Sequence, residues 1–176
     1  MTLRQQLPRI WLLTDERLGD FALDAVSRLP PDAGIVFRHY SLPEGPRRAL
    51  YERVREQARR QGHILLLAGP RSTALSWGAD GWHGWEEGAG LRSAPVHNLH
   101  ELRRAEAGGA ALLFLSPVFP TRSHPGAATL GPRRFAWLAA KARRPVVALG
   151  GVTPANAPKL LRLGAYGWAG IDAWAG

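Results

Sequence analysis

The chain reads Leu115-Ser-Pro-Val-Phe-Pro-Thr-Arg-Ser-His-Pro-Gly126, and a later run reads Val146-Val-Ala-Leu-Gly-Gly-Val-Thr153. Each run is apolar and then breaks into glycine, proline and small hydroxyl residues before a helical pattern resumes. In a parallel α/β protein, such a break marks the carboxyl end of a strand, which is where ligands bind. The two stretches therefore predict parallel strands with a ligand site at their carboxyl ends.

Composition sets the class of protein. A chain of 176 residues, 45% hydrophobic, predicts one globular domain over residues 1–176. The chain has no cysteine, which excludes disulfides and thiolate metal sites. No apolar run approaches the roughly 20 residues of a membrane span, and the N-terminus lacks the apolar core of a signal peptide. We therefore expect a cytoplasmic protein with no membrane partner.

The formal net charge of +9 would suit a nucleic-acid partner. The arginines, however, are spread over several predicted helices, and the densest group, from Arg47 to Arg60, is interleaved with Glu52 and Glu56. That pattern is typical of a solvated helix face. No basic segment alternates with the stacking aromatic residues that a single-strand platform requires. The charge therefore predicts a preference for anionic small molecules and no nucleic-acid partner.

Short apolar runs recur along the whole chain and predict eight strands. They are Ile10–Leu13, Ile35–Phe37, Ile64–Leu67, Ala79–His83, Ala94–Val96, Ala111–Phe114, Val146–Leu149 and Tyr166–Ile171. The stronger runs are continuous rather than alternating, as expected for parallel strands that are covered on both faces.

Amphipathic segments between these runs predict helices. They are Phe21–Leu29, Pro46–Gln61, Asn98–Ala107, Pro132–Ala142 and a segment that begins with Thr153 as N-cap and proline at the first helical position. Strand followed by helix, repeated eight times, predicts an α/β fold, a (β/α)8 barrel. A doubly wound sheet is the alternative, but no Gly-x-Gly-x-x-Gly loop follows the first strand.

The barrel must be compact, since about 250 residues is typical of this fold. The segment from Gly84 to Gly90 is too short and glycine-rich for a proper fourth helix, and only residues 172–176 follow the last strand. We expect a reduced fourth helix and no eighth helix. Apolar surface near Trp168, Ile171 and Trp174 would then be uncovered, and a homodimer or the N-terminal segment 1–7 would cover it.

The chain resembles the thiamin-phosphate synthase and thiazole tautomerase family from about Arg9 to Ile171. The resemblance rests on the two stretches quoted first and on Ala79-Asp-Gly-Trp-His83, Val96-His-Asn98 and Gly164-Ala-Tyr-Gly-Trp168. It implies a TIM barrel of cytoplasmic thiamin biosynthesis whose ligand is thiazole phosphate or thiamin phosphate.

Phosphate in such barrels often binds backbone N–H groups in the loops after strands seven and eight. We therefore predict phosphate ligands at Gly150 and Gly151 and at Ala169 and Gly170, although glycines there could also simply turn the chain. The resemblance implies the same site for thiazole phosphate. Ala169 stands where the synthases usually have a serine.

The loop after strand six offers Thr121, Ser123 and His124, a set of hydroxyl and cationic groups that suits a diphosphate or a carboxylate. By resemblance to the family pattern Thr-x-Thr-Lys, Ser123 and His124 replace the second threonine and the lysine. Arg38 ends strand two, matches the family's arginine there, and is a natural diphosphate ligand.

His124 and His83 are the candidates for acid–base catalysis, since histidine titrates near neutral pH. His83 ends strand four, where it either faces the site or braces the short loop that follows. The histidine spacings form no recognisable zinc motif.

The synthases hold diphosphate with magnesium, which needs carboxylate ligands. Where the family has an Asn-Asp pair after strand three, this chain has Ala68 and Gly69; near the family's aspartate after strand four, only Glu86 and Glu87 offer substitutes. The resemblance therefore implies an eroded magnesium site. Three functions stay open: a synthase-like transferase, a metal-independent thiazole tautomerase that uses His124 or His83, and a non-catalytic binding protein for a phosphate ligand.

Overall fold

The computed structural model describes residues 7–121, 126 and 128–174. Its eight strands pair in parallel and in chain order, and β8 pairs with β1 to close the barrel. The strands are β1 Ile10–Leu13, β2 Gly34–Phe37, β3 Ile64–Ala68, β4 Gly81–His83, β5 Leu91–Val96, β6 Leu112–Leu115, β7 Val146–Ala148 and β8 Gly167–Gly170. The predicted α/β barrel is therefore confirmed.

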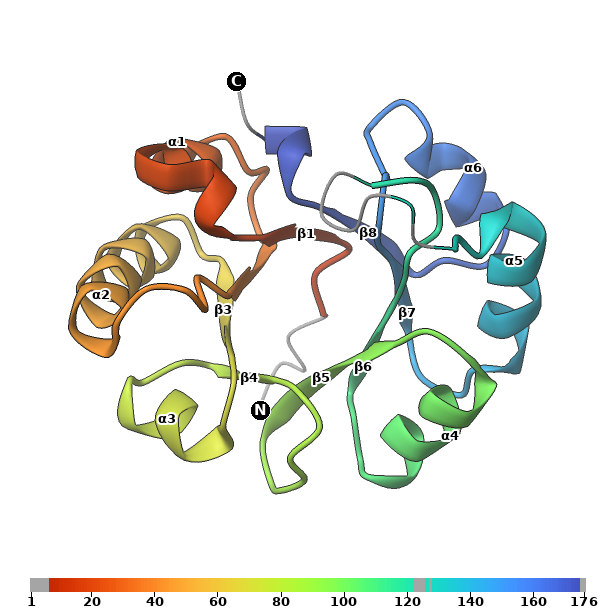
Figure 1. Cartoon of the computed structure of the whole chain (residues 1–176), viewed down its shortest axis with the longest axis horizontal. Coiled ribbons are helices and arrows are strands. Elements are labelled where there is room, and N and C mark those ends of the chain that lie inside the picture. The colour runs from red at the N-terminus through yellow and green to blue at the C-terminus, as the bar shows by residue number, and fades with distance from the viewer. Residues whose placement is uncertain (1–6, 122–125, 127, 175–176) are drawn as a thin grey trace, which may run out of the picture.

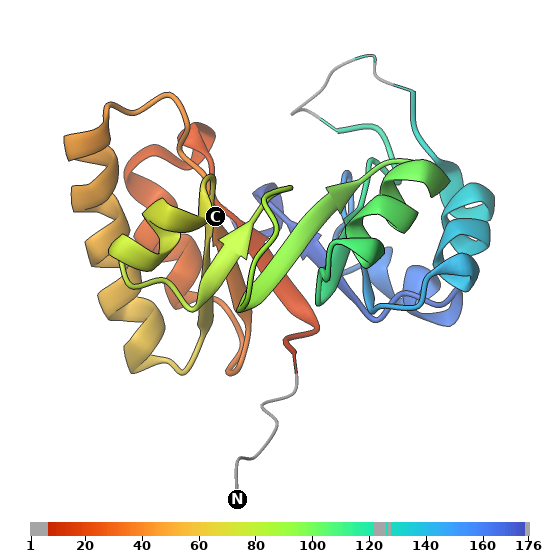
Figure 2. The same ribbon diagram turned by 90° about the horizontal axis from the view of Figure 1, so that it is seen from below.

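Helices surround the strands on the outside of the barrel (Figures 1 and 2). They are α1 Ala22–Ser27, α2 Glu44–Arg60, α3 Arg71–Ser76, α4 Leu99–Ala107, α5 Gly131–Lys141 and α6 Ala157–Arg162, with 3-10 helices η1 Glu16–Phe21 and η2 Asp172–Trp174. As predicted, Asn98 caps α4, because its side-chain oxygen accepts a hydrogen bond from the Glu101 amide.

One predicted helix begins later than expected, and one helix of the structure was not predicted. The last helix begins at Ala157 rather than directly after Thr153, because a hydrogen-bonded turn comes first: the Thr153 carbonyl accepts from the amides of Asn156 and Ala157. Helix α3 was not predicted, since six residues are too few to display a helical period.

The barrel interior is filled by aromatic side chains from opposite parts of the chain. Trp11 of β1 meets Phe114 of β6 edge to face, with ring centroids 5.4 Å apart and planes at 82°. The indole N–H of Trp11 donates to the Pro8 carbonyl, so the buried polar atom is satisfied. Gly34 on β2 is required beside this ring, because a Cβ there would overlap the indole. These rings fill the barrel below the carboxyl ends of the strands.

No helix joins β4 to β5, in agreement with the predicted reduction of the fourth helix. Side chains hold the connecting segment 84–90 instead. Arg92, only 1% exposed, donates to the carbonyls of Gly84 and Trp85 and, at 3.0 Å, to that of Ala105 at the end of α4. Arg71 donates to the Ala89 carbonyl in the same way. Arginine donors thus satisfy backbone carbonyls of this segment, which forms no helix.

The C-terminal end of the described chain covers β8. Trp174 in η2 stacks on Trp168, with centroids 5.6 Å apart and planes at 16°, and its carbonyl accepts a hydrogen bond from Arg28. Trp168 and Ile171 are consequently buried within one chain. The expectation that this surface lacks cover was wrong, because a single 3-10 turn carrying a tryptophan suffices to cover it. No helix in the described ranges is long and apolar enough to cross a membrane.

Substituting Arg92→Met should lower the free energy of unfolding by roughly 2–4 kcal/mol, because one buried and two partly buried carbonyls lose their donor. Urea denaturation followed by circular dichroism measures the change. Arg104→Met is the matched control: Arg104 is exposed on α4 and only stacks over the Trp85 ring, so we expect a loss of less than about 1 kcal/mol. Equal losses in both variants would contradict a special role for Arg92.

Candidate functional site

A cavity of about 600 Å³ opens at the carboxyl ends of the strands. It brings together residues that sequence reasoning proposed from five separate parts of the chain. They are Arg38, His83, Thr121, Gly150, Gly151, Ala169 and Gly170. Two further proposed residues, Ser123 and His124, lie outside the described residues, although Thr121 next to them lines the cavity.

The cavity lining combines positive charge with apolar surface. Its ionisable side chains, as far as the structure describes side chains, are Arg17, Arg38, His83 and His97, with no aspartate or glutamate. Leu13, Leu149, Val152 and Ile171 supply apolar walls. Such a lining attracts an anionic ligand that also carries an apolar body.

Arg38 is held by residues that directly follow β1. Its Nε donates to the Thr14 carbonyl at 3.0 Å, and its Nη2 donates to Asp15 Oδ2 at 2.9 Å. The same carboxylate accepts from Arg17 Nη2 at 2.8 Å. One buried carboxylate therefore orients two guanidinium groups.

Sequence reasoning missed Asp15 and Arg17. The available signal was their position: Thr14 and Asp15 are polar residues placed directly after a predicted apolar strand. Asp15 also accepts a hydrogen bond from the Arg17 amide and so caps η1.

His39 lies beneath this cluster and does not line the cavity. It is almost fully buried, its ring stacks on Phe37 at a centroid distance of 4.8 Å, and its Nδ1 lies 3.0 Å from Thr14 Oγ1. Burial lowers the pKa of the imidazole, although Glu16 and Asp15 oppose the shift. His39 is therefore a neutral residue that supports Thr14.

His83 projects from the end of β4 against the edge of the barrel core. Its ring lies 5.2 Å from that of Phe114 at an angle of 84°, and its Nδ1 lies 2.8 Å from Ser93 Oγ on the neighbouring strand β5. Burial, reinforced by the positive charge of Arg38, lowers the pKa of His83 to about 3. The imidazole is consequently neutral at physiological pH. His97, on the rim, is half-exposed and is bonded to Glu101 through Nδ1 at 2.8 Å.

The strand-seven glycines face the cavity in a conformation that favours glycine. Gly150 and Gly151 have φ values of +94° and +61°. A Cβ on Gly150 would lie 2.7 Å from Pro117 Cα, so the close approach of the β6 loop also requires glycine. Among the described residues, the two N–H groups have no acceptor.

The two glutamates proposed as substitute metal ligands lie away from the cavity. Glu86 accepts a hydrogen bond from the Arg71 amide at the start of α3, at 2.8 Å. Glu87 lies beside Arg92 and Gly108. Within the described part of the chain, no cluster of three or more Asp, Glu, His or Cys side chains could hold a metal ion. Neither glutamate is among the residues that line the cavity.

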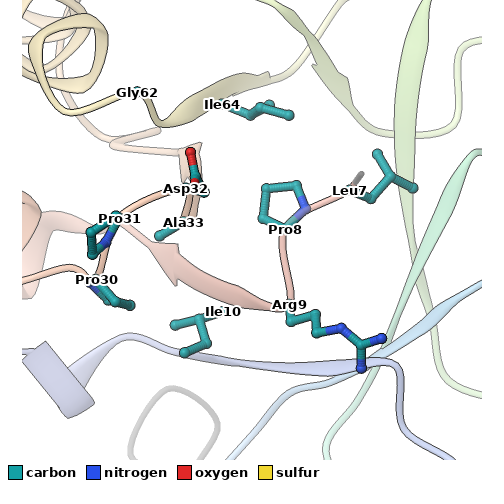
Figure 3. A pocket seen from close by; sticks show the side chains of 10 residues that line it. All are labelled: Leu7, Pro8, Arg9, Ile10, Pro30, Pro31, Asp32, Ala33, Gly62 and Ile64. Carbon is teal, nitrogen blue, oxygen red and sulfur yellow. The ribbon is translucent and has the colours of Figure 1, made fainter. Parts of the chain in front are cut away.

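A second cavity, of about 470 Å³, lies at the opposite, amino-terminal end of the first three strands (Figure 3). Arg9 and Asp32 both line it but point apart (Figure 3), and Arg9 instead donates to the Tyr166 carbonyl and lies over the Tyr166 ring. That end of a barrel carries stability rather than chemistry. The cavity at the carboxyl ends is therefore the candidate functional site.

The fold and this cavity define a (β/α)8-barrel protein with a cavity at the carboxyl ends of its strands, lined by Arg17 and Arg38. Residues 32–174 match the family model described as thiamine monophosphate synthase. The chain belongs to the thiamine monophosphate synthase family.

Individual relatives agree with this membership. A thiamine-phosphate synthase of Salinispora arenicola is 32% identical, covering 95% of this chain and 89% of the relative. A thiamine-phosphate synthase of Pyrococcus furiosus is 28% identical, covering 98% and 89%. The solved structure of a thiamine phosphate pyrophosphorylase from Pyrococcus furiosus superimposes with a TM-score of 0.81 at 24% identity, covering 96% of this chain and 88% of that one. At that identity the structural match supports the fold.

Substituting Asp15→Asn should lower the free energy of unfolding by roughly 1–3 kcal/mol, because Arg38 and Arg17 both lose a charged partner while the cap survives. Thermal and chemical denaturation measure the loss. The matched control is Glu56→Gln, which removes an ion pair with Arg60 that is largely exposed and should cost less than about 0.5 kcal/mol. If Asp15→Asn left the free energy of unfolding unchanged, the cluster would not stabilise the rim.

Proposed function

We propose that this protein binds thiazole phosphate or thiamin phosphate in the cavity at the carboxyl ends of the strands, as a thiamin-phosphate synthase-like protein of thiamin biosynthesis. The observation that carries the proposal is the lining itself. Two arginines and two glycine-bearing strand ends face one cavity, and none of its described side chains is acidic.

In this proposal the phosphate is bound at Gly150 and Gly151 and at Ala169 and Gly170. The amides of Gly150 and Gly151, which have no acceptor among the described residues, and their left-handed backbone support that position. The heterocycle would pack against Val152 and Ile171. Arg38, with Thr121, Ser123 and His124, would then bind the far end of the ligand.

We further propose that the magnesium–diphosphate site of the family is eroded in this chain. Support comes from Ala68 and Gly69 in place of the expected ligands and from the location of Glu86 and Glu87 outside the cavity. The described carboxylates do not gather at the cavity, so they offer magnesium no set of ligands beside a bound diphosphate.

Two alternatives share the same ligand class. A metal-independent thiazole tautomerase would need His124 or His83 as acid or base, because moving a proton requires a group aimed at the ligand. A non-catalytic binding protein would need only the phosphate contacts. The location of His83 on the cavity wall supports contact with the ligand in either case.

The proposal places the protein in the cytoplasm, with phosphorylated small molecules as its partners. The proposal also includes a homodimer, with an interface on α5 and α6. Trp168 and Ile171 are covered within one chain, whereas Trp137 on α5 and Leu161 on the neighbouring helix α6 are 51% and 41% exposed. Exposed apolar side chains on adjacent helices support an interface there.

Thiazole phosphate should raise the melting temperature, while the unphosphorylated thiazole alcohol should not. At a ligand concentration 100 times Kd, the free energy of unfolding rises by about 2.7 kcal/mol. For a chain of this size, that raises the melting temperature by roughly 5–10 °C. Differential scanning fluorimetry with both compounds measures the shift. Inorganic phosphate alone is the control for charge. Equal shifts from phosphate ester and alcohol would remove the phosphate site from the proposal.

Thiamin-phosphate synthase activity should be weak or absent even with excess magnesium, because the described carboxylates are not at the cavity. A coupled assay for diphosphate release, with and without chelator, tests this. Rapid turnover that the chelator abolishes would contradict the eroded site and would direct attention to Glu86 and Glu87.

A further inference from the structure

Ser93 and His83 form a buried pair at the cavity floor. They are paired in register on adjacent strands, β5 and β4, and Ser93 Oγ lies 2.8 Å from His83 Nδ1. Ser93 is completely buried, whereas His83 reaches the cavity surface. The pair therefore joins an inaccessible hydroxyl to a ring that a ligand can touch.

The direction of this hydrogen bond follows from what surrounds Ser93. Among the described residues, its hydroxyl has one hydrogen-bond partner, His83 Nδ1. If the imidazole were the donor, the serine hydrogen would be left without an acceptor among the described residues, which costs about 1–3 kcal/mol. The hydroxyl must therefore donate, and Nδ1 must accept.

A neutral imidazole that accepts at Nδ1 carries its hydrogen on Nε2. His83 Nε2 is not among the buried polar atoms that lack a partner, unlike His39 Nε2 and both ring nitrogens of His63. Since His83 lines the cavity and its Nδ1 is engaged, Nε2 is the nitrogen left for the cavity side.

We propose that Ser93 is a positioning residue that holds His83 in the Nε2–H tautomer, so that His83 donates a hydrogen bond to an acceptor oxygen of the bound ligand. The inference rests on the proposed function in that a ligand occupies this cavity. It adds that the ligand needs an acceptor oxygen on the β2–β4 side, where Arg38 also lines the cavity.

The same geometry prevents His83 from acting as a base. In this tautomer Nε2 has no lone pair to accept a proton, and the other nitrogen is occupied by Ser93. Burial and the charge of Arg38 both disfavour the imidazolium form. His83 in this form therefore orients the ligand and cannot act as its base.

The first measurement uses the wild-type protein without ligand. Long-range ¹H–¹⁵N correlation spectra report the tautomer of each of the six histidines, and the His83→Gln spectrum assigns the His83 signal by its absence. We expect the Nε2–H form of His83, unchanged between pH 5 and 8. The Nδ1–H form, or an imidazolium at pH 7, would overturn the proposal. Exposed His100 provides the reference for an unconstrained ring.

The second measurement is the Kd for thiazole phosphate by calorimetry. Ser93→Ala should weaken binding about 3- to 10-fold, the loss of one neutral hydrogen bond, and should release His83 into a mixture of tautomers. Ser93→Thr keeps the hydroxyl and should keep both the wild-type Kd and the Nε2–H form of His83. His83→Gln keeps a donor at the position of Nε2 and should bind within about 3-fold of wild type, whereas His83→Phe should not.

The outcomes separate the two proposals. If wild-type protein binds no thiazole phosphate but its His83 is in the Nε2–H form, the proposed ligand is wrong and the tautomer assignment stands. If the ligand binds and Ser93→Ala changes neither Kd nor the tautomer, the role of Ser93 is refuted. The spectrum of the wild type decides the tautomer even if a variant fails to fold.

Discussion

Closure of eight very short parallel strands into one ring is the constraint on which the rest of this structure depends. Each strand has only three to six residues, so the interior must be filled by large side chains, and Trp11 and Phe114 do this across the ring. Closure also brings every strand's carboxyl end to one rim. Arg38 and Gly170, more than a hundred positions apart in the sequence, consequently line the same cavity.

Two arginines with little solvent contact illustrate how a small barrel uses charge in different ways. Arg38 is balanced by Asp15 yet remains on the cavity wall, where its charge can act on a ligand. Arg92 lies away from the cavity and donates to backbone carbonyls. The first lines the cavity, and the second supports a segment that forms no helix. The two arginines differ in their acceptors: Arg38 donates to a carboxylate at the rim, and Arg92 donates to backbone carbonyls.

Much of the fold was predictable, because continuous apolar runs such as Ile64–Leu67 coincide with buried parallel strands. Two short elements were not predicted. They are α3 and the 3-10 turn in which Trp174 covers Trp168. In the site, glycine pairs and Arg38 could be identified from their positions after strands. The Ser93–His83 pair could not, because it arises from the register between β4 and β5, which no local pattern specifies. Ser123 and His124 stay predictions.

The described lining of the cavity has a consequence for the state in which a phosphate ligand arrives. In a cell, phosphate esters exchange between the free anion and complexes with divalent cations, which neutralise part of their charge. A wall of arginine, neutral histidine and backbone amides, with no carboxylate among its described side chains, gives such a cation no ligand of its own. If the ligand is the phosphate ester that we propose, the wall would compete with the cation for the same phosphate oxygens and would favour the bare anion.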